Sequence, residues 1–156
     1  KGKIENINVD GSKNDALDLS NSSVEIKNFE AKNIGDKGIS VGENSYLFGK
    51  NIIIDKAFLG LASKDQSETE IENLVITNSN IGLASYIKKH EYNSSTININ
   101  ELSTSNNLQD FLFEEGSKIK IDGKINENFE INVFEKIYLP KKLNQKHTLS
   151  QNVIYD

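Results

Sequence analysis

The chain has 156 residues, no cysteine and a formal net charge of −5, and its 18 cationic side chains are all lysines. Without cysteine there is no disulfide framework, thiolate metal site or cysteine nucleophile. Without arginine or a basic balance, specific nucleic-acid recognition is not expected. No stretch approaches the roughly 18 consecutive apolar residues of a membrane-spanning helix, so no membrane span is expected.

The sequence repeats itself with a period of roughly 22 residues. An earlier copy covers residues 3–22, three clear copies follow between residues 23 and 86, and the repeat continues beyond them in weaker form. A fifth copy is expected over residues 96–113, and a sixth opens at residues 118–123. Self-similarity of this period is the signature of a solenoid.

Within each copy, apolar and polar residues alternate, which is the periodicity of strands rather than helices. Three strands are expected in every coil, each with a pair of inward side chains. The inward pairs are Val24/Ile26, Leu47/Gly49, Thr69/Ile71, Ile97/Ile99 and Ile119/Ile121 on the first strand, Ile7/Val9, Phe29/Ala31, Ile52/Ile54, Leu74/Ile76 and Leu102/Thr104 on the second, and Leu17/Leu19, Ile39/Val41, Leu61/Ser63, Leu83/Ser85 and Phe111/Phe113 on the third. We therefore predict an all-β chain that folds as a right-handed, single-stranded parallel β-helix of about five to six coils, with three parallel sheets around a dry core.

Two columns of special residues accompany the strands. The asparagine column is expected to form a structural ladder inside the turn between the first and second strands, where side-chain amides bond the coils above and below. Ligand binding is the alternative role for this column. A glycine column follows the second turn and is expected to provide either positive φ or tight coil stacking. The asparagines are Asn6, Asn28, Asn51 and Asn73, and the glycines are Gly38, Gly60 and Gly82.

This three-strand coil, with stacked aliphatic residues and an asparagine at one turn, resembles the pectate-lyase-like family of right-handed parallel β-helix repeats over roughly residues 2–125. The family includes polysaccharide lyases, hydrolases, mannuronan epimerases, phage tailspikes and surface modules, so the resemblance implies a fold and assigns no catalytic residue. Lyases of this fold generally rely on arginine as the base and on clustered aspartates for calcium. This chain has no arginine, and Asp15 and Asp18 are the only close acidic pair on one outward row. No cofactor and no metal site is therefore expected, with calcium at Asp15 and Asp18 as the alternative.

The regular spacing breaks once, where residues 87–95 form an insertion of about six residues next to the turn at residues 63–67. Insertions in a solenoid protrude from turns and often carry binding residues. Lysines suit a carboxylate, a tyrosine can stack on a sugar ring, and a histidine or a lysine of lowered pKa can act as a base. The candidate ligand-binding residues, with a solvated charged loop as the alternative, are Lys64, Asp65, Lys88, Lys89, His90, Glu91 and Tyr92.

After Gly123 the pattern loosens. Residues 129–133 are expected to form one more strand and residues 136–156 an irregular C-terminal cap or tail, so the repeats occupy residues 1–135. The candidate cap residues are Phe129, Phe134, Tyr138 and Leu139, with Lys141, Lys142 and Lys146 at the solvated edge of the cap. On the outward side of the second strands, Ile53 and Val75 are expected to form a small apolar patch that a loop or the C-terminal tail covers.

The predicted function is that of a non-catalytic β-helix module of a secreted or cell-surface bacterial protein, serving as a rigid spacer or a carbohydrate-contacting platform. This prediction depends on a strong repeat that carries no clustered catalytic set. A polysaccharide lyase or epimerase acting on an acidic glycan is one alternative, and a subunit of a fibre or oligomer is another. An acidic polysaccharide is the expected partner, and further domains are expected in a longer parent chain.

Overall fold

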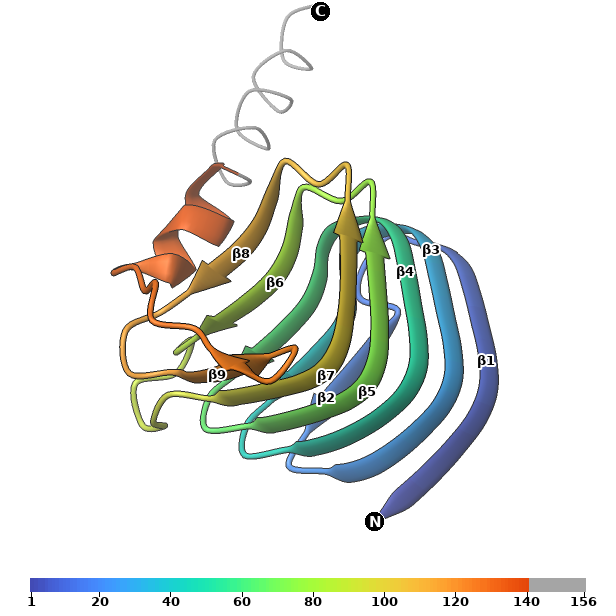
Figure 1. The fold of residues 1–156 in the computed structure, drawn as a ribbon, viewed down its shortest axis with the longest axis horizontal. Coiled ribbons are helices and arrows are strands. Elements are labelled where there is room, and N and C mark those ends of the chain that lie inside the picture. The colour runs from blue at the N-terminus through green and yellow to red at the C-terminus, as the bar shows by residue number, and fades with distance from the viewer. Residues whose placement is uncertain (141–156) are drawn as a thin grey trace, which may run out of the picture.

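The computed structural model describes residues 1–140 as an all-β solenoid of about five turns (Figure 1). The predicted fold class is thereby confirmed. A short helix at residues 133–140 follows the strands. The strands are β1 (Gly2–Ser12), β2 (Leu17–Ser20), β3 (Ser23–Gly42), β4 (Tyr46–Lys64), β5 (Glu68–Thr77), β6 (Ile81–Tyr86), β7 (Thr96–Ser105), β8 (Gln109–Phe113), β9 (Lys118–Ile121) and β10 (Lys124–Ile125).

Successive coils pair in parallel at the spacing of the sequence repeat. β1 pairs with β3, β3 with β4, β4 with both β5 and β6, and β5 with β7. Because β3 and β4 bend through the corners, each of them contributes to three faces of the solenoid (Figure 1). We call these the first face (residues 23–27 and 46–50 with their register partners), the second face (residues 29–34 and 52–57) and the third face (residues 37–42 and 59–64).

The inward positions form one continuous core, as the alternation predicted. In the central coils these side chains are buried, and the fully enclosed ones include Ile26, Ile39, Leu47, Ile54, Leu61 and Ile76. In the end coils, Ile7, Val9 and Leu102 are only half-buried and Phe111 is 37% exposed. These residues have a neighbouring coil on one side only, so the core is least covered at its ends.

Each corner of the coil is turned by residues with positive φ. The first corner contains Asn6, Asn28 and Asn51, the second contains Gly11, Asn33, Lys56, Asn78 and Asn106, and the third contains Asn21, Glu43, Asn44, Asp65 and Gln66. Glycine and asparagine adopt this left-handed backbone at the least cost among the common residues. The corners therefore explain why asparagine is so abundant in the chain.

The asparagine ladder lies on the outer surface, which corrects its predicted position inside the solenoid. Asn28 Nδ2 donates to Asn6 Oδ1 at 2.9 Å, and Asn51 Nδ2 donates to Asn28 Oδ1 at 3.0 Å, with all three side chains exposed. In the second copy of this corner, Ile26 and Phe29 are buried, and Lys27 and Asn28 between them are exposed. Asn73 leaves the ladder and donates to Glu101 Oε2 at 2.7 Å.

The glycine column allows neighbouring coils to approach closely. A Cβ atom on Gly38 would lie 2.7 Å from the carbonyl oxygen of Gly60, and one on Gly60 would lie 2.6 Å from the carbonyl oxygen of Gly82. None of the three has positive φ. Of the two roles that the sequence allowed, tight stacking is therefore the one that these glycines have.

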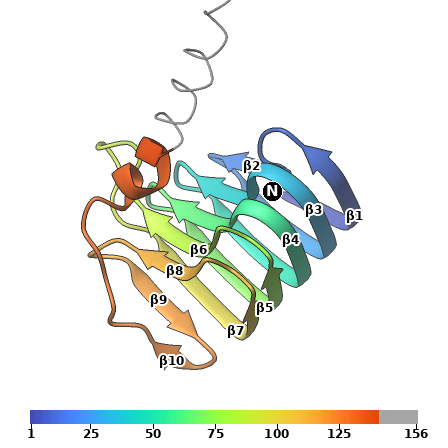
Figure 2. The ribbon, with the colours of Figure 1, turned by 90° about the horizontal axis from the view of Figure 1, so that it is seen from above.

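The parallel stack ends in a hairpin and a helix rather than in a further strand. β9 pairs in parallel with β7, and β10 turns back and pairs antiparallel with β9 at one end of the stack (Figure 2). The strand predicted over residues 129–133 is wrong, because Val133 begins the helix. Val133 and Ile137 are both fully buried, and their spacing of four residues places them on one face of a helix.

The helix covers the outer side of the third face and not the end of the core, which corrects the predicted cap. Phe134 and Tyr138 are half-buried against this side, whereas Phe129 and Leu139 are 36% and 50% exposed. The predicted cap lysines Lys141, Lys142 and Lys146 lie outside the described residues.

We expect Gly60→Ala to destabilise the protein by about 2 kcal/mol, because the added Cβ would overlap the backbone of the next coil and that backbone cannot rotate away. Chemical denaturation measures the loss. Gly2→Ala is the matched control, because no atom lies closer than 3.9 Å to its added Cβ. Equal stability of the two variants would contradict the stacking role.

Candidate functional site

The outward side chains of the third face form three columns across the coils. The first contains Lys37, Leu59, Ile81 and Gln109, the second contains Asp18, Ser40, Ala62, Ala84 and Leu112, and the third contains Ser20, Gly42, Lys64 and Tyr86. The second column changes from polar residues in the early coils to apolar residues in the later coils, and the first column is apolar at Leu59 and Ile81. The C-terminal helix lies alongside β6 and β8, over the apolar half (Figure 1).

Tyr138 extends this helix cover to the border of the polar half. Its hydroxyl lies 2.8 Å from that of Tyr86, and the two rings pack edge to face. Burial, followed by the neighbouring Tyr138, raises the pKa of Tyr86 well above its ordinary value. The Tyr138 ring also lies 5.8 Å from Lys37 Nζ and 5.9 Å from Lys88 Nζ. We call Lys37, Lys64 and Lys88 the lysine cluster.

Lys37 is a buried cation with carboxylate partners. Its Nζ lies 3.3 Å from Asp15 Oδ1 and 3.1 Å from Asp36 Oδ2, and the residue is 4% exposed. Burial lowers the pKa of Lys37, but Tyr138, Asp15 and Asp36 together outweigh burial, so that this pKa is raised. Asp15 also accepts a hydrogen bond from the Lys37 backbone. The Asp15 carboxylate is therefore already paired with Lys37 in this structure.

Lys64 is nearly as buried as Lys37 but lacks such partners. Only 7% of the residue is exposed, and within residues 1–140 it forms no ion pair. The side chain of Lys64 lies across Gly42, because a Cβ atom added to Gly42 would lie 2.6 Å from Lys64 Cε. Burial, followed by repulsion from Lys37 and Lys88, lowers the pKa of Lys64.

Two buried oxygen atoms, one on the third face and one at the third corner, also lack partners. Among the described residues, the buried side-chain oxygens without a hydrogen bond are Ser40 Oγ and Asp65 Oδ2. Ser40 lies two residues before Gly42 in the same coil, and Asp65 follows Lys64 directly. Buried polar groups are nearly always bonded, so these two exceptions mark the third face and its corner as unusual parts of the structure.

The inserted loop is attached to the solenoid beside this cluster. Asp65 Oδ1 accepts hydrogen bonds from the backbone nitrogens of Lys88 at 2.7 Å and Lys89 at 2.9 Å. Lys89 Nζ lies 2.6 Å from Glu43 Oε1. The hydrogen bond from Lys89, and then one from Ser20, lowers the pKa of Glu43.

The structure brings part of the predicted candidate group together. Lys64, Asp65, Lys88 and Lys89 meet at the third corner, as the adjacent turn and insertion suggested. His90 and Glu91 are exposed, and Tyr92 is half-buried through a turn in which its nitrogen donates to Lys89 O at 3.1 Å. The sequence analysis missed Lys37, Ser40, Tyr86 and Tyr138, although Lys37, Ser40 and Tyr86 occupy outward positions of the repeat around Lys64.

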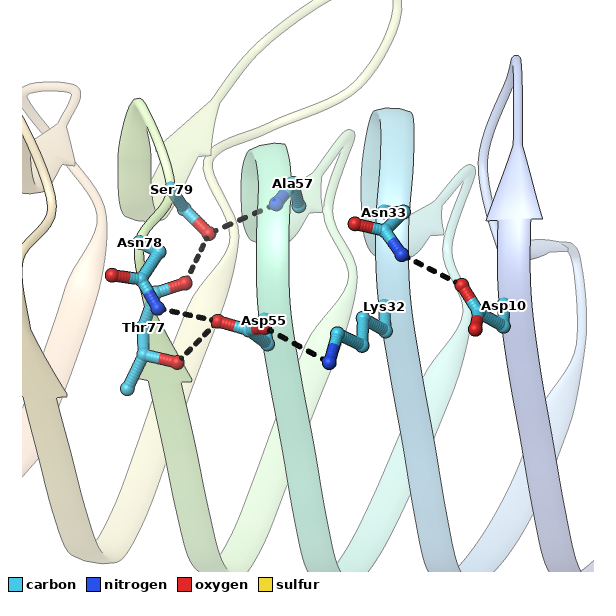
Figure 3. A network of polar contacts seen from close by, with 8 residues as sticks. All are labelled: Asp10, Lys32, Asn33, Asp55, Ala57, Thr77, Asn78 and Ser79. Carbon is cyan, nitrogen blue, oxygen red and sulfur yellow. Dashed lines mark hydrogen bonds and ion pairs between the residues drawn. The ribbon is translucent and has the colours of Figure 1, made fainter.

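The second corner carries a different polar network, in which each carboxylate has partners (Figure 3). Asp55 Oδ1 accepts from Asn78 Nδ2 at 2.6 Å and from Thr77 Oγ1 at 2.8 Å, and Asp10 accepts from Asn33 at 2.7 Å. The hydrogen bond from Asn78 is the largest cause that lowers the pKa of Asp55. These bonds connect successive coils, so we assign them to the fold.

The predicted apolar patch remains open in the described part of the chain. Ile53 is 44% exposed, while Val75 is half-buried. Ile53 lines a shallow groove of about 360 Å³ together with the asparagine ladder. The helix at residues 133–140 packs on the third face and not on this patch.

Residues 1–140 contain no group of three or more His, Asp or Glu side chains placed to hold a metal ion. Within the same residues, no helix is long and apolar enough to cross a membrane. No protein family model, no curated protein and no solved structure matches the chain.

We expect the stability of the wild-type protein to rise relative to Lys64→Met as the pH increases from neutrality towards 10.5, the ordinary lysine pKa. A lowered pKa means that the unfolded state binds more protons than the folded state in this range, and stability then increases with pH. Urea denaturation at several pH values measures the difference, with Lys27→Met as an exposed control. A difference that falls with pH would contradict the burial of an unpaired ammonium.

Proposed function

We propose that this chain is a rigid β-helix module of a secreted or cell-surface bacterial protein, of the right-handed pectate-lyase-like type. The observation that carries the proposal is the single parallel ladder from β1 through β3, β4, β5 and β7 to β9. Every internal coil is hydrogen-bonded on both sides and shares one core with its neighbours. A bend between two coils would break several bonds at once, so the stack resists bending.

Such a module suits a spacer because its length is set by the number of coils. Neighbouring coils are separated by the strand spacing of about 4.8 Å. The extra corner bonds of Asn28 and Asn78 connect one coil to the next at the surface, where a bending force would act first. Sequence changes on the outward side leave this spacing untouched, so the faces are available for other roles.

We expect spin labels at Asn8→Cys and Ser103→Cys to give one narrow distance distribution. The two positions lie in the same column of the second face, four coil spacings or about 19 Å apart. The natural chain has no cysteine, so each label reports one site. Pulsed electron spin resonance measures the distribution, with singly labelled chains as controls. A broad or bimodal distribution would contradict a rigid spacer.

A second role, contact with an acidic glycan, is favoured by the lysine cluster and the loop beside it. Lys88 is exposed, and its Nζ lies 5.9 Å from the Tyr138 ring, which offers an apolar surface next to a cation. Sugar rings stack on aromatic faces, and uronate carboxylates pair with ammonium groups. Asp65 holds the start of the loop through two backbone bonds, so the loop is partly preorganised.

We expect Lys88→Ala/His90→Ala to weaken binding of the purified protein to immobilised polyuronate by about tenfold, or 1.4 kcal/mol. A glycan array followed by calorimetry measures the change. Lys27→Ala, which removes one exposed lysine far from the loop, is the control. Equal binding by the double variant and the control would show that the loop does not contribute to polyuronate binding. Ultraviolet absorbance from uronate unsaturation would show that the module is instead a lyase.

A further inference from the structure

Lys64 is a nearly buried lysine, 7% exposed, without a carboxylate at ion-pair distance among the described residues. Removing an ammonium group from water is costly unless a counter-charge or good hydrogen bonds replace the water. Lys37, on the same face, has two carboxylates within 3.3 Å of its Nζ. Lys64 has none at ion-pair distance in the described chain, and two other lysines repel it.

Ser40 adds a second unsatisfied group on the same side of the solenoid. Its hydroxyl is fully buried and bonds no other described residue. A hydroxyl can donate one hydrogen bond and an ammonium group can donate three. Unused donors near an unpaired cation are complementary to an oxyanion, because an anion would supply both acceptors and charge.

The nearby carboxylates do not already fill this role. Asp15 and Asp36 both pair with Lys37. Asp65 accepts the two backbone bonds of the loop through Oδ1, and its Oδ2, which has no hydrogen-bond partner, is not at ion-pair distance from Lys64. Asp18 is exposed and raises the pKa of Lys64 through space, without coming within ion-pair distance. It is the natural competitor for a bound anion, since it attracts the same ammonium group.

We propose that the third face contains an oxyanion site, in which Lys64 supplies the charge and Ser40 a hydrogen-bond donor. The ligand group is a carboxylate or a phosphate, and Lys88 at the exposed rim is the first cation that an approaching anion meets. If the ligand group is a carboxylate, this inference rests on the proposed glycan contact and assigns the position of one uronate group. If the ligand group is a phosphate, the inference is independent of that proposal.

The test uses the full chain and two probes, inorganic phosphate and trigalacturonate, with the corresponding neutral galactose trimer as a blank. Hydrogen bonds to charged groups are stronger than those between neutral groups, so we expect Lys64→Met to weaken binding by about 10-fold or more. Ser40→Ala should weaken binding several-fold while leaving stability unchanged or slightly higher, since it removes an unsatisfied buried hydroxyl. Asp18→Asn should strengthen binding, because it removes the competitor. Lys27→Met, an exposed lysine on the first face, should bind like the wild type.

The pattern of results separates this site from the loop. Loss of binding in Lys64→Met and Ser40→Ala, with a gain in Asp18→Asn, supports the site, and the probe that binds identifies the ligand as carboxylate or phosphate. Wild-type affinity in Lys64→Met or Ser40→Ala overturns it, as does the absence of binding to either probe up to about 10 mM. If polyuronate binding depends on Lys88 and His90 but not on Lys64, the glycan proposal stands and the oxyanion site falls.

Discussion

The parallel stacking of coils is the constraint on which the rest of this structure depends. Each strand must lie one strand spacing from its counterpart in the next coil. Every corner must therefore bend the chain at the equivalent position of each repeat. This requirement explains the residues of positive φ at the corners and the close approach at Gly60, where no side chain fits. It also makes every column of side chains a row of near-identical environments. A residue that departs from its column therefore stands out.

The third face departs from this uniformity most clearly. Its later coils present Ala62, Ala84 and Leu112 outward, and an apolar outer surface on a solenoid must be covered or left as a contact site. The C-terminal helix covers it with Val133 and Ile137. Tyr138 of this helix lies beside the lysine cluster, with its ring 5.8 Å from Lys37 Nζ and 5.9 Å from Lys88 Nζ. The helix therefore places an aromatic ring next to these cations.

The sequence was sufficient for the repeat, the strand register and the inward side chains, because these follow from a periodic pattern in which each coil supports the next. It was insufficient where an environment depends on a single neighbour. Lys56 occupies a left-handed corner that asparagine fills in adjacent coils, and nothing in its identity reveals this. Alternation at residues 129–133 indicated a strand. In the structure Val133 begins a helix instead, and it is buried together with Ile137, four residues later on the same helix face. Lys64 was found through its position beside the insertion, whereas Lys37 and Ser40 were missed because they belong to an earlier coil that carries no insertion.

The comparison of Lys37 with Lys64 gives the strongest argument for a role beyond folding. Both lysines are almost completely buried on one face of one solenoid, yet their pKa values shift in opposite directions. The difference is that Tyr138, Asp15 and Asp36 lie beside Lys37 and raise its pKa, whereas Lys64 has no ion-pair partner among the described residues. A fold selected only for stability gains nothing from a nearly buried lysine that its neighbours repel and that has no ion-pair partner, since an apolar residue of similar size would avoid the desolvation cost. The structure tolerates that cost at Lys64 and at Ser40 together, and a ligand that satisfies both groups is the simplest physical reason for keeping them.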